Sequence, residues 1–178
     1  MNKLSYSLSN FDIKKYLGNK ALIINYKQLD DIDNLEKFMN YKNINFLIIL
    51  YEYEQNYGHW SCVIKNDIQN IFEFFDPYGT KPDVQLNEIP MRLRNQFGLE
   101  HPKVAILLYE SNKPIVYNNY KLQQEKNGTN TCGKWVVIRC CTYLLPIETF
   151  ALLFMQKRQS NNDKELQKIW NNFIRNFI

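Results

Sequence analysis

The pattern of apolar and polar positions predicts short helices and strands that alternate along the chain. Helical spacing of apolar residues, with capping or stopping residues at the ends, predicts helices over residues 9–18, 30–40, 132–145, 147–159 and 163–177. Short apolar or alternating runs predict strands over residues 21–26, 45–53, 58–65, 70–76, 103–110 and within 114–123. Residues 83–97 are expected to be helical with a break at Pro90. Strands in the middle of the chain with helices around them indicate an α+β domain.

The helix expected to begin at Cys132 has apolar or small side chains on every face. Lys134 and Arg139 are its only charges, which is typical of a helix enclosed on most sides. The N-terminus of such a helix directs unpaired N–H groups and a partial positive charge at Cys132, which favours the thiolate, the form that attacks carbonyl carbons. Gly133 is expected to leave room for a substrate backbone. The alternative is that Cys132 only fills the start of a core helix.

Length and composition favour one compact domain that spans residues 1–178. A chain of 178 residues buries roughly two thirds of its unfolded surface, and 45% hydrophobic residues can fill one core. The net charge of +4 comes without a dense Lys/Arg block, so it favours an acidic partner such as DNA only weakly. The N-terminal residues lack the apolar region of a signal peptide, and no apolar run is long enough to span a membrane. We therefore expect an intracellular protein that is neither secreted nor membrane-bound.

The four cysteines do not form a disulfide framework by spacing, because Cys140 and Cys141 are adjacent and three of the four lie in expected core segments. In a chain that is not secreted we expect free thiols. Cys62, Cys140 and Cys141 are interpreted as buried apolar residues, with a redox or activator-linking role as the alternative. A zinc site of His59, Cys62, Cys132 and Cys140 is disfavoured, because no C-x-x-C pair anchors it.

A cysteine nucleophile needs a base, and the chain has two histidines. His101 precedes a proline in an expected loop and has no evident partner in the sequence nearby. His59 opens an expected strand, and Asp76 ends the next one. A tight turn between Asp67 and Ile68 would place His59 directly opposite Asp76, close enough for the carboxylate to orient the imidazole. A register shift of one residue would put the two side chains on opposite faces, and His59 would then be a surface or packing residue.

Three short motifs occur in a fixed order along the chain: GHW at residues 58–60, FFDPYGTKPD at residues 74–83 and TCGKW at residues 131–135. With a glutamine ahead of the cysteine, this order resembles the adenovirus-type and SUMO-deconjugating cysteine proteases, including the adenain-like maturation proteases of large DNA viruses and virophages. The resemblance extends over residues 21–145. It implies a papain-like cysteine protease core, with a central mixed β-sheet and a buried helix that begins at the nucleophile.

The resemblance implies a role for each matching residue. Cys132 would be the nucleophile, His59 the general base and then the general acid, and Asp76 the group that orients His59. Trp60 resembles the tryptophan of the family that lines the substrate cleft. A tryptophan at this position is equally well explained as a core aromatic residue.

The oxyanion-hole glutamine of the family has two candidates here, Gln123 and Gln124. Both stand farther from Cys132 than the family pattern implies, and Lys126 is nearer the customary place. We prefer Gln123 because it ends an expected strand, and a slightly longer loop after it would absorb the extra residues.

The resemblance further implies an endopeptidase that cleaves viral capsid and core precursor proteins after small residues such as glycine during virion maturation. Such an enzyme needs no metal or cofactor, and the sequence leaves open whether a peptide or DNA activates it. We expect a monomer that acts on protein substrates in the host cytoplasm or viral factory and is packaged in the virion. Two other activities on this scaffold stay open, namely deconjugation of ubiquitin-like proteins and acyl transfer. A non-catalytic binding or structural protein is disfavoured, because such a role gives no reason for this set of residues in this order.

Overall fold

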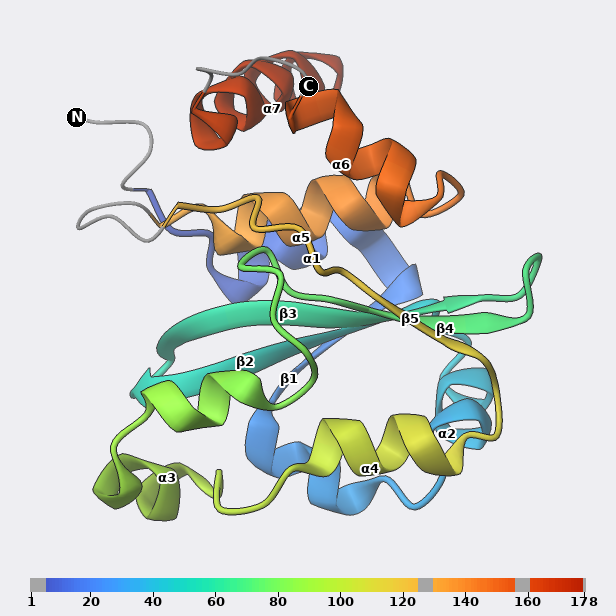
Figure 1. The fold of residues 1–178 in the computed structure, drawn as a ribbon, viewed down its shortest axis with the longest axis vertical. Coiled ribbons are helices and arrows are strands. Elements are labelled where there is room, and N and C mark those ends of the chain that lie inside the picture. The colour runs from blue at the N-terminus through green and yellow to red at the C-terminus, as the bar shows by residue number, and fades with distance from the viewer. Residues whose placement is uncertain (1–5, 125–129, 156–160, 178) are drawn as a thin grey trace.

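The computed structural model describes residues 6–124, 130–155 and 161–177, and its centre is a five-stranded mixed β-sheet (Figure 1). The strands lie side by side in chain order, with bounds β1 Ala21–Asn25, β2 Phe46–Glu54, β3 Tyr57–Asn66, β4 Ile71–Phe75 and β5 Ile115–Tyr117. The three middle strands are antiparallel neighbours, whereas β1 and β5 join the two edges in parallel. The predicted α+β fold with a central mixed sheet is confirmed.

Helices cover both faces of this sheet (Figure 1). One face carries α1 Asn10–Leu17, α5 Cys132–Cys141, α6 Ile147–Met155 and α7 Asn162–Phe177. The other carries α2 Leu35–Tyr41, α3 Met91–Phe97 and α4 Lys103–Glu110. Three short 3-10 segments complete the described elements: η1 Gly18–Lys20, η2 Tyr26–Asp31 and η3 Val84–Glu88. An apolar core lies on each side of the sheet, so the sheet is buried between two helical layers.

Local signals in the sequence set several helix boundaries as predicted. The hydroxyl of Ser9 accepts a hydrogen bond from the N–H of Asp12, and the Asp12 carboxylate accepts one from the N–H of Ser9, which starts α1 with a capping box. Pro90 separates η3 from α3 and stands immediately before the first residue of α3, where its missing N–H is not needed. The last predicted residues of α6, 156–159, lie outside the described residues.

The predicted strand over residues 103–110 is wrong, because this segment is the helix α4. Its buried residues are Val104, Leu107 and Leu108, which recur at the three- and four-residue spacing of one helix face. Pro102, just before the helix, is well suited to a helix start. A short apolar run without polar interruptions can be a buried strand or a buried helix, and its periodicity alone does not distinguish them.

The β3–β4 hairpin has a register two residues away from the predicted one. Cys62 lies opposite Phe75, so the position of Asp76 corresponds to that of Ser61 instead of His59. The turn takes up residues 67–70 and is wider than a two-residue turn. Because side chains alternate between the faces of a strand, a shift of two residues leaves Asp76 on the same face as His59 and makes the two diagonal neighbours.

α5 is enclosed along almost its whole length, as predicted. Every residue from Cys132 to Cys140 is buried, including the charged Lys134 and Arg139. Arg139 forms two parallel hydrogen bonds with Glu73 of β4, from Nε to Oε1 at 2.7 Å and from Nη2 to Oε2 at 2.6 Å. The exposed fractions of Arg139 and Glu73 are 0% and 4%, so this ion pair joins the helix to the sheet inside the core.

α5 ends at Cys141, four residues before the predicted end at Leu145. The guanidinium of Arg139 also donates to the carbonyl oxygens of Thr142, at 3.0 Å, and Leu145, at 2.9 Å. These bonds require the chain after Cys141 to turn back towards Arg139. The same side chain thus holds the helix to the sheet and satisfies carbonyl groups beyond its C-terminus.

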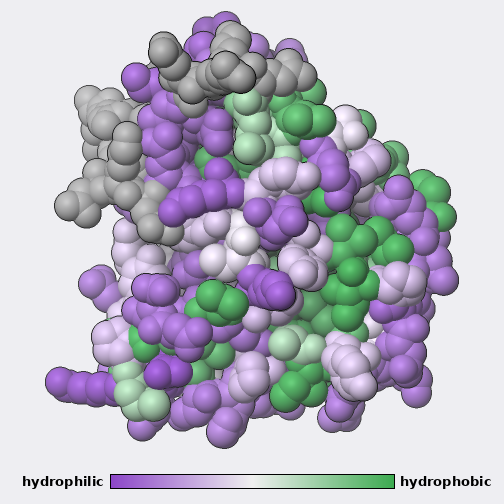
Figure 2. Space-filling model, viewed as in Figure 1, coloured by the Kyte–Doolittle hydropathy of each residue, from purple (hydrophilic) through white to green (hydrophobic). Residues whose placement is uncertain are grey.

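The outer surface is not uniformly polar. In Figure 2, apolar side chains gather to the right of centre, on the side where Figure 1 has the β4 and β5 labels. α6 also leaves Leu152 and Leu153 exposed, at 56% and 53%. Its outer side is therefore apolar and is not covered by the described part of the chain. None of the helices within residues 6–124, 130–155 and 161–177 is long and apolar enough to cross a membrane.

Removing one partner of the Arg139–Glu73 pair should destabilise the protein strongly. Glu73→Gln keeps the side-chain shape but leaves Arg139 buried without its counter-charge. We expect the free energy of unfolding, measured by urea denaturation, to fall by about 3–5 kcal/mol. The control is Lys168→Ala, because Lys168 forms a 2.8 Å pair with Glu165 on the surface, and its loss should change stability by less than about 1 kcal/mol. Small and equal losses in both variants would contradict the anchoring role of the buried pair.

Candidate active site

His59 and Asp76 form a buried pair at one end of the sheet. His59 is the third residue of β3, and Asp76 directly follows the last residue of β4. The Nε2 of His59 lies 3.0 Å from the Oδ2 of Asp76, and the two residues are 3% and 0% exposed. The structure therefore brings His59 and Asp76 together as the sequence predicts. They occupy diagonal positions on β3 and β4 instead of directly opposed ones.

Asp76 is itself held in place by its neighbours in the chain and by Asn118. Its second carboxylate oxygen, Oδ1, accepts a hydrogen bond from the N–H of Tyr78 at 2.8 Å. Its carbonyl oxygen accepts one from the Nδ2 of Asn118 at 2.6 Å. Because both the side chain and the backbone are fixed, the carboxylate presents one oxygen to His59 in a single orientation.

Cys132 is the first residue of α5, is 6% exposed and forms a hydrogen bond with the imidazole of His59. Since Asp76 engages Nε2, the ring nitrogen left to face the thiol is Nδ1. Burial alone would lower the pKa of His59. The charge and hydrogen bond of Asp76, together with the contact with Cys132, outweigh burial and raise the pKa of His59 to about 10. His59 therefore carries two ring protons at neutral pH.

The segment that leads to Gln123 is tied to the turn after Asp76. The N–H of Gln123 donates to the carbonyl of Pro77 at 2.9 Å. Gly79 has a φ of 73°, and a Cβ at this position would lie 2.7 Å from the carbonyl carbon of Tyr120, so glycine is required by both conformation and space. This close backbone contact places Gln123 next to the residues that surround His59.

Of the two glutamine candidates, Gln123 is the one whose side chain faces the site. Gln123 is 1% exposed, and its Nε2 donates to the hydroxyl of Tyr78 at 3.2 Å. That bond uses one of the two amide protons, which leaves the other for a ligand. Gln124 instead donates its backbone N–H to Asp163 at 2.9 Å. Lys126, nearer the customary family position, lies outside the described residues.

Tyr78 contacts His59, Asp76 and Gln123. The sequence did not predict its place in the site. Its ring stacks on the His59 ring with 4.8 Å between centroids and 18° between planes. Its N–H donates to Asp76, and its hydroxyl accepts from Gln123. The only sequence signal is its position two residues after Asp76 in the DPYG turn, where a tyrosine could equally well be a surface residue.

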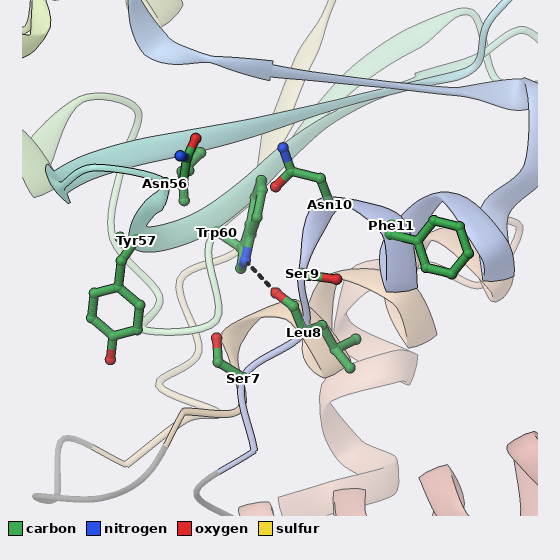
Figure 3. A pocket seen from close by; sticks show the side chains of 10 residues that line it. Ser7, Leu8, Ser9, Asn10, Phe11, Asn56, Tyr57 and Trp60 are labelled. Carbon is green, nitrogen blue, oxygen red and sulfur yellow. Dashed lines mark hydrogen bonds between the residues drawn. The ribbon is translucent and has the colours of Figure 1, made fainter.

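Trp60 points to the opposite face of β3 from His59, because neighbouring strand residues alternate. It is 3% exposed and belongs to the core on the α5 side. Figure 3 shows its Nε1 directed at the carbonyl oxygen of Leu8, to which it donates at 3.2 Å. Trp60 also lines a pocket of about 210 Å³ between the segment before α1 and the turn that joins β2 to β3 (Figure 3). It is thus both a core aromatic residue and the wall of a pocket.

The prediction that Gly133 leaves room for a substrate backbone is wrong. A Cβ at Gly133 would lie 3.0 Å from the Cβ of Leu8 and 3.3 Å from the Cδ1 of Trp60. The space in front of Gly133 is filled by side chains of the protein itself. The glycine therefore allows the N-terminal segment to pack against the start of α5.

A groove flanks His59 on the side of η3. Two pockets of about 360 and 270 Å³ share the lining residues Tyr53, His59, Gln85 and Glu88. The first also includes Tyr78 and Thr80, and the second extends to Ile89 and Pro90. Their shared lining makes them parts of one groove beside the imidazole.

The remaining thiols do not contribute to this site. All four cysteines are free, and the Sγ atoms of the fully buried Cys62 and Cys140 are 3.9 Å apart. Cys141 is exposed, which contradicts the prediction that it is buried, because it is the last residue of α5 and extends past the enclosed part. Within the described residues, no group of three or more His, Cys, Asp and Glu side chains could hold a metal ion. His101 is exposed in the segment before α4 and lies outside the site.

Several solved structures are similar to this one at low sequence identity. The C-terminal Ulp1 protease domain in complex with Smt3, the yeast orthologue of SUMO, has 11% identity and a TM-score of 0.43, over 82% of this chain and 70% of that chain. ChlaDub1 from Chlamydia trachomatis has 14% identity and a TM-score of 0.42, over 94% and 78%. The central domain of Lpg1148 from Legionella pneumophila has 16% identity and a TM-score of 0.40, over 97% and 99%.

No protein-family model matches the chain. A protein of the Sputnik virophage, the uncharacterized protein V9, is 35% identical over 154 residues, which cover 84% of this chain and 86% of V9. The identity is above 30% and extends over most of both chains, which is sufficient to show a common family. The chain therefore belongs to the same protein family as V9 of the Sputnik virophage.

Proposed function

We propose that this chain is a cysteine endopeptidase, with Cys132 as the nucleophile, His59 as the general base and then acid, and Asp76 as the group that orients His59. One observation carries the proposal: His59 is held between Asp76 and Cys132 at the N-terminus of a fully buried helix. A thiol at a helix start is by itself unremarkable. Its contact with a carboxylate-bound imidazole is the arrangement that activates a sulfur nucleophile.

The raised pKa of His59, about 10, places a protonated imidazole beside the sulfur of Cys132. The positive end of α5 and the imidazolium both stabilise the negative sulfur. The sulfur then attacks a peptide carbonyl carbon, a C–S bond forms, and the carbonyl oxygen becomes an oxyanion.

Gln123 and the backbone N–H of Cys132 would stabilise that oxyanion. His59 gives its proton to the leaving amine as the C–N bond breaks. Water then attacks the thioester carbonyl, and His59 accepts a proton from this water. The C–S bond breaks, the acid product leaves, and the protonated imidazole is restored. Each step uses a group of the chain itself.

The groove beside His59 would bind the substrate in an extended conformation. Trp60 lines a separate pocket on the opposite face of β3, so it would not contact a chain bound in this groove. Residues 1–178 would act as one catalytic domain on protein substrates. Within this reading we propose cleavage of capsid or core precursors after small residues during virion maturation, with packaging of the enzyme in the particle. The virophage origin of its relative V9 supports a viral role.

The same site chemistry is compatible with deconjugation of ubiquitin-like proteins and with acyl transfer. Ubiquitin-like proteins with an electrophile at the C-terminus would label Cys132 if the first of these were the activity. Transfer of acetyl groups that depends on acetyl-CoA would identify the second. Cleavage of glycine-rich precursor segments by the wild type, and not by Cys132→Ala, would establish the endopeptidase.

Iodoacetamide should alkylate Cys132 faster than any other cysteine, although Cys132 is only 6% exposed. Cys141 is the internal control, because it is exposed and is not part of the His59–Asp76 pair. We expect the rate at Cys132, located by mass spectrometry, to fall at least tenfold in His59→Ala and the rate at Cys141 to stay the same. Faster alkylation of Cys141 than of Cys132, with a rate at Cys132 that does not change in His59→Ala, would mean that Cys132 is only a packing residue.

Gln123→Ala should lower the rate of acylation by p-nitrophenyl acetate about 10²- to 10³-fold, because this reaction passes through a tetrahedral oxyanion. Alkylation by iodoacetamide forms no oxyanion, so its rate at Cys132 should stay within about twofold. Gln124→Ala is the matched control and should leave both rates near those of the wild type. A selective loss of acylation in Gln124→Ala would assign the donor to Gln124 instead.

The protonation state of His59 predicts a pH dependence of stability. Its pKa is about 10 in the folded protein, against roughly 6.5 in an unfolded chain, so the folded state binds the proton more tightly. The stabilisation is fully present below about pH 6.5 and is lost as the pH rises through about 10. The difference in unfolding free energy between wild type and His59→Gln, from urea denaturation, should therefore decrease over this range. A constant difference over this range would contradict the raised pKa of His59.

A further inference from the structure

We propose that Asp163, in the first turn of α7, is a positioning residue for this site. It binds the residue that precedes Cys132 and the residue that follows Gln123, and so fixes the nucleophile relative to the oxyanion donor. This inference rests on the proposed function. It concerns a residue of the C-terminal helix, far in the sequence from every motif that suggested the catalytic residues.

The carboxylate of Asp163 is the meeting point of three hydrogen bonds. Its Oδ1 accepts from the hydroxyl of Thr131 and from the Nε1 of Trp135, the latter at 3.0 Å. Its Oδ2 accepts from the backbone N–H of Gln124 at 2.9 Å. Asp163 is 1% exposed, so these contacts lie in the interior, where they are strong and geometrically demanding.

The bonded partners are adjacent in the chain to the reacting groups. Thr131 is covalently joined to Cys132, and Gln124 to Gln123. The two oxygens of one carboxylate are about 2.2 Å apart by covalent geometry, so both chain segments must approach the same small group. A displacement of either segment by an ångström would change the distance between the sulfur and the oxyanion donor, and such misplacement can cost about 100-fold in rate.

The bond from Thr131 also affects the helix that begins at Cys132. A threonine before a helix usually accepts a hydrogen bond from a first-turn N–H. Here Thr131 has φ −103° and ψ −2°, which is not the extended conformation of a capping residue, and makes no side-chain capping bond. Its hydroxyl proton goes to Asp163. The hydroxyl of Thr131 is therefore directed at α7 instead of at the first turn of α5.

The buried carboxylate of Asp163 needs compensation, because a buried charge is costly. Lys134 of α5 interacts with it electrostatically. The three donors and the nearby positive end of α5 compensate for that cost. An apolar residue at position 163 could pack α7 against α5 without the cost of burying a charge. The carboxylate adds what an apolar residue cannot: a fixed distance between two chain segments.

Asp163→Asn tests the proposal, because an amide has one acceptor oxygen and cannot serve both oxygens' partners. We expect acylation of Cys132 by p-nitrophenyl acetate to fall about 10- to 100-fold, while alkylation by iodoacetamide stays within about twofold. Thr131→Val is the second variant. It removes one donor and leaves the carboxylate in place, so it should show the same selective loss even if Asp163→Asn folds poorly.

Asp83→Asn is the matched control. Asp83 is also buried and accepts three hydrogen bonds, from the hydroxyls of Tyr26 and Tyr51 at 2.7 and 3.1 Å and from the N–H of Ala105 at 2.8 Å. It ties together elements on the opposite face of the sheet from α5. The same substitution there should lower the melting temperature while leaving the ratio of acylation to alkylation unchanged.

The outcomes separate this inference from the proposed function. If wild-type Cys132 is acylated and alkylated no faster than Cys141, the proposed function fails. If the wild type reacts selectively at Cys132 but Asp163→Asn and Thr131→Val keep both rates, or lose both equally, only the role of Asp163 is overturned. A selective loss of acylation in both variants, absent in Asp83→Asn, supports it.

Discussion

The buried ion pair between Arg139 and Glu73 is the interaction on which the rest of the structure depends. It joins α5, a helix enclosed on nearly all sides, to the sheet by two charge-assisted hydrogen bonds. Apolar contacts alone would let a smooth helix slide or rotate over the sheet. Two parallel charge-assisted bonds in a medium of low polarity fix both its position and its rotation. Because α5 is rigid, fixing its C-terminal half also places Cys132, two turns away, at the end of the sheet.

At that end of the sheet, the carboxylate of Asp76, the imidazole of His59 and the thiol of Cys132 interact in that order. Asp76 is fully buried and held by the Tyr78 N–H, so its negative charge is directed at the imidazole. The imidazole in turn carries a proton, because that charge outweighs the effect of burial on its pKa. The resulting positive charge lies in front of the thiol of Cys132. Burial thus strengthens each interaction in the series and prevents water from weakening it.

The C-terminal helix has two roles that depend on one another. Leu166 and Trp170 pack its apolar side into the core that also contains α5. That packing brings Asp163 to the interior, where its carboxylate meets Thr131, Trp135 and Gln124. The helix therefore both completes the core and connects the two chain segments that lead to Cys132 and Gln123. Loss of its apolar contacts would be expected to disturb the site as well as stability.

The sequence by itself determined the elements with strong local signals. The Ser9 cap, the break at Pro90, the enclosed helix at Cys132 and the shared face of His59 and Asp76 all follow from periodicity and capping, which act over a few residues. Only the tertiary structure decided what depends on contacts between distant segments. The apolar run of α4 became a helix because three of its residues face a core, and the hairpin register followed from a wider turn. The space beside Gly133 and the contacts of Gln123, Tyr78 and Asp163 depend on chain segments tens of residues apart, and no local pattern encodes which of them will meet.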